Sequence, residues 1–189
     1  MAFGGLIALA AAAANTPAAL PVHQVSARPL VARLSTAIGA CMARMVTPAG
    51  FAVSAADGLH SGGAVPMLAN VPAPPDWGQA SDYRVDGGDG VVWVTSYADR
   101  DVCRVFAGDN PGVPAARGLL AASLLQSGAW TSESPLKLAQ GTGQVALDRF
   151  RSVAVPGVKM MFSGPARSMN DGSGLQLLVV VSKSEKANH

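Results

Sequence analysis

Cys41 and Cys103 are the only cysteines in this chain of 189 residues, and they constrain its fold more than any other feature. They are too few and too far apart in the sequence to build a zinc site. In an oxidising compartment, an even pair of cysteines in a small domain favours a disulfide. Closing a loop of this length stabilises a fold by about 4 kcal/mol in the chain-entropy account. In a reducing compartment the same residues would be two separately buried thiols.

The amino terminus predicts export to an oxidising compartment. Residues 6–14 form an uncharged apolar run with an Ala-x-Ala site at its end. The run is too short to cross a bilayer, which takes about 20 residues, but it suits the centre of a signal peptide. We therefore predict a signal peptide at residues 1–14 and a flexible leader at 15–28. The mature protein would lie in the periplasm or outside the cell, with no membrane span.

The amino terminus lacks one feature of a signal peptide, so an amino-terminal helix remains an alternative. No Lys or Arg precedes the apolar run, so the basic start of a signal peptide is missing. An Ala-rich amino-terminal helix packed on the domain would also account for the run. The sequence Asn-Thr-Pro at residues 15–17 would end such a helix abruptly, which favours export.

The composition describes one domain with an apolar interior. Hydrophobic residues make up 49% of the chain and charged residues 14%, well below the roughly 25% charged fraction of ordinary soluble domains. The net charge is +2 and the basic residues are scattered, so the basic stripe that a nucleic-acid surface needs is missing. We predict a single domain over residues 29–183, a disordered tail at 184–189, and no nucleic-acid partner.

A helix is expected over residues 29–45, with Ser26 as its cap. Its apolar positions recur at spacings of three and four residues, and they are Leu30, Leu34, Ile38, Cys41 and Met45. Cys41 therefore lies on the buried face of this helix, near its carboxyl end. A disulfide would fasten the helix to the strand that carries Cys103.

Most of the remaining regular segments are strand-like. Apolar runs bounded by turn residues predict strands at residues 83–85, 91–97, 102–107, 144–155, 158–163 and 175–183. The first two form a hairpin, and the last is apolar on both faces, which predicts a central position. Gly164 and Pro165 interrupt the fifth, which indicates a bulge or an edge. A second helix is expected at 115–127, ended by Gly128.

These elements predict an α+β domain, with an antiparallel sheet of about five strands and two main helices packed on one face. The portion that runs strand, strand, helix and three strands is similar in order to profilin-like or PAS-like domains. That resemblance implies a ligand pocket between the sheet and a helix.

An acid, a histidine and a serine fall close together at Asp57, His60 and Ser61. A hydrolytic site needs a base within hydrogen-bond reach of a nucleophile and an acid that orients the base. Adjacency in sequence does not produce that geometry, and the Gly-x-Ser-x-Gly turn that positions a nucleophilic serine is absent here. The same residues also suit a polar surface loop. A small hydrolase centred on His60 is kept as an alternative function.

Other short motifs do not indicate a cofactor or a metal. Residues 86–90 resemble the start of a calcium loop, but the twelfth position, where such a loop places Glu, is Tyr97. Residues 141–146 match a dinucleotide-binding pattern by letter, but a strand is expected to follow where that site requires a helix. Met160 and Met161 suit core packing better than a copper site. We predict no cofactor and no metal site.

The segment 47–79 is irregular, rich in Pro and Gly, and holds Trp77. An aromatic side chain in such a loop either contacts a ligand or partner or anchors the loop onto the core. We predict a non-enzymatic binding or inhibitor-like accessory protein, whose partner is an unknown protein or small ligand. It would use this loop, Trp77 and an exposed sheet edge. The alternatives are the hydrolase and a ligand-sensing domain of the profilin/PAS type.

Overall fold

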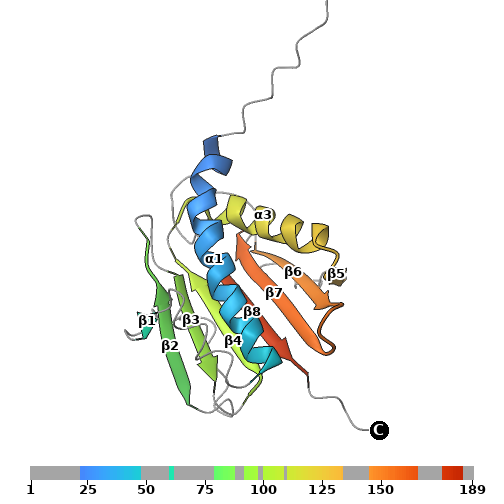
Figure 1. Ribbon diagram of the computed structural model, residues 1–189. Coiled ribbons are helices and arrows are strands. Elements are labelled where there is room, and N and C mark those ends of the chain that lie inside the picture. The colour runs from blue at the N-terminus through green and yellow to red at the C-terminus, as the bar shows by residue number, and fades with distance from the viewer. Residues whose placement is uncertain are drawn as a thin grey trace, which may run out of the picture.

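The computed structural model describes residues 22–47, 60–61, 79–87, 92–97, 100–108, 110–133, 145–165 and 176–184. These residues form one antiparallel sheet with two helices on one of its faces (Figure 1). The arrangement confirms the predicted α+β class and the placement of both helices. The predicted signal peptide at 1–14 lies outside the described residues.

Seven strands of four or more residues and one two-residue strand form the sheet, in the order β1-β2-β3-β4-β8-β7-β6-β5. In chain order they are β1 (His60–Ser61), β2 (Ala80–Val85), β3 (Val92–Tyr97), β4 (Val102–Ala107), β5 (Trp130–Glu133), β6 (Val145–Ser152), β7 (Val158–Pro165) and β8 (Leu177–Lys183). The prediction of about five strands is too low. β1 and β5 are too short for an alternating apolar pattern to reveal them.

The position of β8 agrees with its prediction, and the end of β7 does not. β8 lies between β4 and β7, which confirms the central position predicted from its two apolar faces. The expected edge or bulge at Gly164 and Pro165 is wrong, because both residues pair with β6 within β7. Pro165 is the last residue of the strand and lies beyond the part of β7 that pairs with β8. A Cβ on Gly164 would lie 3.0 Å from the carbonyl oxygen of Gln176, so the glycine allows the chain before β8 to approach closely.

The helix α1 (Val22–Val46) starts seven residues before its predicted start, and both Ser26 and Pro29 lie inside it. The expected cap at Ser26 is therefore wrong. The predicted apolar stripe is confirmed, since all five of its residues are buried: Leu30, Leu34, Ile38, Cys41 and Met45. At the carboxyl end, Lys183 Nζ donates a hydrogen bond to the carbonyl oxygen of Met45 at 3.1 Å. A lysine there satisfies one of the free carbonyls of the last turn.

The helix α3 (Val113–Gln126) lies close to its predicted range. Before it, the Asn110 side-chain oxygen accepts a hydrogen bond from the backbone N–H of Gly112 at 2.8 Å. After it, Gly128 adopts a φ of +68°, a left-handed conformation that glycine reaches without steric cost. The expected helix end at Gly128 is thus confirmed. The positive φ turns the chain directly into β5.

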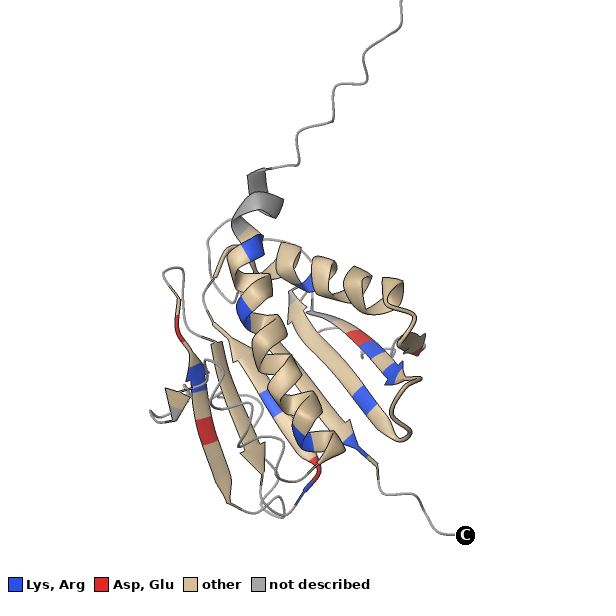
Figure 2. Cartoon of the chain, in the orientation of Figure 1, with Lys and Arg blue, Asp and Glu red and all other residues tan. Residues whose placement is uncertain are grey.

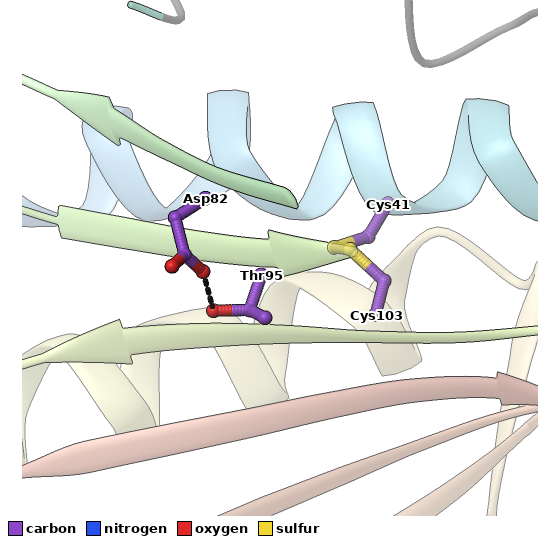
Figure 3. The surroundings of a disulfide bond; sticks show 4 residues. All are labelled: Cys41, Asp82, Thr95 and Cys103. Atoms are coloured by element: carbon purple, nitrogen blue, oxygen red, sulfur yellow. Dashed lines mark hydrogen bonds between the residues drawn. A yellow bond between two sulfur atoms is a disulfide. The ribbon is translucent and has the colours of Figure 1, made fainter. Parts of the chain in front are cut away.

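A disulfide joins Cys41 on α1 to Cys103 on β4, with 5.5 Å between the two Cα atoms. Both side chains are fully buried. Figure 3 shows the bridge between the helix and the sheet, close to the hydrogen bond from the Thr95 hydroxyl to Asp82. The predicted pairing is confirmed. Among the described residues, neither helix combines the length and the apolar character needed to cross a membrane.

The disulfide also defines the two faces of the sheet. Because Cys103 points toward α1, its alternate neighbours on β4 and the residues paired with them share that face, which we call the helix face. The opposite side is the outer face. On this face, β3, β4 and β8 each contribute one buried large side chain: Tyr97, Phe106 and Leu178. Charged residues are found farther along the sheet, on β6 and β7 (Figure 2).

Candidate functional site: the β5 edge of the sheet

β5 is the terminal strand on the α3 side of the sheet. Its first residue, Trp130, pairs with Ser152 and is 9% exposed. Ser152 shares the helix face with Phe150, so the indole lies among the core side chains and fixes which way the strand faces. Thr131 and Glu133 consequently point to the outer face. Thr131 and Ser132 are both exposed.

The hydrogen-bond pattern of β5 leaves backbone groups directed away from the sheet. The N–H of Val153 donates to the carbonyl oxygen of Ala129 at 2.8 Å, so these opposed residues form a hydrogen-bonded pair. Hydrogen-bonded pairs alternate along an antiparallel ladder. Thr131 and Glu133 therefore direct their peptide groups to β6, and Ser132 directs its N–H and carbonyl outward. Among the described strands, none lies beyond β5.

One carboxylate and three cations meet on the outer face beside this edge. Glu133 Oε1 accepts hydrogen bonds from Arg151 Nε at 2.9 Å and from Arg151 Nη2 at 2.7 Å. Its other oxygen lies 3.1 Å from Arg149 Nη2, and Lys159 Nζ is 3.9 Å from Oε1. The two arginines come from β6 and the lysine from β7 (Figure 2). We call these four residues the Glu133 cluster.

The cluster carries two positive charges in excess, since three cations surround one carboxylate. The hydrogen bond from Arg151 lowers the pKa of Glu133, and the charges of Lys159, Arg151 and Arg149 act in the same direction against the effect of desolvation. Glu133 is only 15% exposed, whereas Arg151 is 61% exposed. The acid is thus enclosed and ionised, and the cations face solvent. Such an arrangement attracts anionic groups.

A groove between α1 and α3 is a second candidate site. Its volume is about 220 Å³, and its lining residues come from both helices and β7: Ser35, Ile38, Gly39, Leu120, Ser123, Leu124 and Phe162. Small side chains stand at its rim, and the buried Phe162 forms part of its floor. A Cβ built on Gly39 would meet nothing within 4 Å. The groove is smaller than the roughly 300 Å³ of ordinary ligand pockets, so it suits a small apolar group.

The residues singled out from the sequence are placed only in part. His60 lies on β1, paired with Arg84 and exposed. Ser61 pairs through its backbone with Tyr83, while Asp57 and Trp77 fall outside the described residues. The hydrolase hypothesis therefore stays a prediction. Within the described part of the chain, no three His, Cys, Asp or Glu side chains come together as metal ligands would.

The Glu133 cluster was not found by sequence reasoning. One signal was present, because Arg149 and Arg151 are two apart in a predicted strand and must share a face. Their partner was hidden because β5 follows α3 after a short turn and has only four residues. Comparison of the chain with protein families, curated proteins and solved structures finds no match.

Proposed function

We propose that this protein is an exported, non-enzymatic accessory protein that binds another protein by accepting an extended segment along the β5 edge. The observation that carries the proposal is the outward-directed backbone of Ser132 on an exposed terminal strand. An added strand would take main-chain hydrogen bonds from this edge and gain specificity from alternate side chains. Trp77 is a further contact residue in this proposal.

The rigidity of the frame supports a binding role. The sheet behind β5 is held by the Cys41–Cys103 disulfide at its centre and by Trp130 at the edge itself. A binding edge that is ordered before contact loses little conformational entropy when the partner arrives. Export, to the periplasm or beyond the cell, belongs to the same proposal, because the disulfide suits an oxidising compartment.

The test is a selection of randomised peptides on the immobilised protein, with two variants of one residue. Ser132→Pro removes the outward N–H, and Ser132→Ala keeps it. Proline is tolerated where the N–H of an edge strand faces away from the sheet, so the fold should survive. We expect the selected peptides to bind the Ala variant as tightly as the parent and the Pro variant about tenfold more weakly.

The amide hydrogen exchange of Ser132 gives a reading that does not depend on the Pro variant folding. A bound strand should slow exchange at this residue, while the amide of Thr131, already bonded to β6, should change little. Failure to enrich any peptide, or enrichment of peptides that bind both variants equally without protecting Ser132, would contradict the proposed function.

The groove between the helices favours a second candidate, a ligand-binding domain of the profilin/PAS type. Its apolar floor at Ile38, Leu120 and Phe162 would hold a small apolar group. Gly39→Leu would fill the groove from the rim without a clash at Cβ. A ligand function predicts that small apolar compounds raise the melting temperature of the parent and not of this variant. The β5 proposal predicts that peptide binding is the same in both.

A further inference from the structure

We infer that the segment bound at β5 is acidic, with an Asp or Glu opposite Thr131 and no acid opposite Glu133. This inference rests on the proposed function, because it names the chemistry of the strand that the β5 edge accepts. It is carried by the placement of the Glu133 cluster relative to the strand edge.

The cations of the cluster meet a side chain of the edge strand. Arg149 and Arg151 belong to β6, yet their guanidinium nitrogens lie 3.1 and 2.7 Å from the carboxylate of Glu133 on β5. The two guanidinium groups therefore reach from β6 to a side chain of β5, the strand that an added segment would join. A strand added to β5 would lie one strand away from this contact.

Hydrogen-bonding capacity is left for an incoming carboxylate. An arginine has five N–H donors, and the bonds of Arg151 to Glu133 use Nε and Nη2. The side chain is 61% exposed, and Lys159 beside it is 42% exposed. Arg151 can thus hold Glu133 and donate to a second carboxylate. Charge-assisted bonds of this kind are stronger than those between neutral groups.

The register of β5 decides where that carboxylate must be. On the outer face, side chains of an added strand stand opposite Thr131 and Glu133, with Cβ atoms about 5 Å away. An acid opposite Glu133 meets a like charge, which is unfavourable. An acid opposite Thr131 meets a hydroxyl, and Arg151 lies one strand farther on, opposite Thr131 in β6. That Cα is about 10 Å from the added strand, a distance that an arginine and a carboxylate span together.

The experiment is a double-mutant cycle on peptides from the selection described above. Arg151→Gln removes the proposed donor, and a Glu→Gln change in the peptide removes the acid. Arg28→Gln on α1, also exposed, makes the same change in net charge away from the edge. We expect each change at the contact to weaken binding about two- to fivefold. The peptide change should have little further effect in Arg151→Gln, and Arg28→Gln should bind like the parent.

The outcomes separate the acidic inference from the proposed function. Selected peptides that are neutral or basic, or a cycle without coupling, would overturn the acidic partner, while loss of binding in Ser132→Pro would still support strand addition. Dextran sulfate tests a third outcome. If it displaces the peptides and binds Ser132→Pro as tightly as the parent, the cluster is a general polyanion surface and the inference is wrong.

Discussion

Both helices pack on the sheet through buried apolar side chains, and each has a further link to it of a different kind. On one side, α1 packs on β3, β4 and β8, and the buried disulfide joins it to β4. On the other side, α3 is tied to β6 by the ion pair between Arg117 and Asp148. The Glu133 cluster joins β5, β6 and β7 on the outer face of that side. Figure 2 shows these charges on β6 and β7.

The two kinds of link differ in how strongly salt and pH affect them. A disulfide and apolar contacts change little with salt or moderate pH, whereas ion pairs weaken with salt and lose their charge in acid. The proposed binding edge belongs to the ionic side. Salt and acid should therefore weaken the contacts at this edge while leaving the disulfide intact.

The largest expected effect comes from the disulfide, on the apolar side. The Cys41→Ala/Cys103→Ala variant should lose about 4 kcal/mol of unfolding free energy, because a loop of 62 residues is no longer closed in the unfolded chain. Denaturant unfolding of the parent, with and without a reducing agent, should show the same loss. Equal unfolding free energies of the oxidised and reduced parent would contradict a stabilising role for the disulfide.

The ion pair on the α3 side should have an effect about half as large. Asp148→Ala leaves Arg117, whose side chain is 13% exposed, without its carboxylate, and should cost about 2 kcal/mol. Arg117→Met is the matched variant. It keeps the packing of the aliphatic stem and leaves Asp148, which is 35% exposed and can be hydrated, so the loss should be about 1 kcal/mol. Equal losses in the two variants would contradict this account.

The apolar side was also the more predictable of the two from sequence. The stripe from Leu30 to Met45 placed Cys41 on a buried face, and the segment 102–107 matches β4 residue for residue. The helix stripe and the strand were both predicted from the spacing of apolar residues, which depends only on residues close together in the sequence. The predicted start of α1 at Pro29 is wrong, because a proline suits the first turn of a helix but this one lies seven residues inside.

The ionic side depends on contacts that no local pattern records. Glu133 meets Arg151 across a separation of 18 residues, and Arg117 meets Asp148 across 31. Which residues pair is decided by the register of β5 on β6, and the four residues of β5 are too few to predict that register. The candidate edge was therefore foreseen only as an unspecified sheet edge.

A pH titration should distinguish the Glu133 cluster from the disulfide. The pKa of Glu133 is lowered in the fold, so its contribution to stability is complete above the unfolded value of about 4.3 and is lost as the pH falls through the folded value. Glu133→Gln should cost about 1 kcal/mol at neutral pH and progressively less below about pH 4. The loss in the cysteine variant should stay constant over the same range. A Glu133→Gln effect that is equally constant would contradict the ionic assignment.

The smallest effect is expected where the two sides meet, at the groove between α1 and α3. Gly39 is inside α1 and a Cβ there would touch nothing within 4 Å, so Gly39→Ala should stabilise the protein by about 0.5 kcal/mol through helix propensity alone. Gly128→Ala is the control, because its φ of +68° makes any Cβ unfavourable, and it should destabilise. Thermal unfolding of both variants checks the signs. If Gly39→Ala destabilises, a methyl group at this position meets an unfavourable contact in solution, and the open space beside Gly39 is wrong.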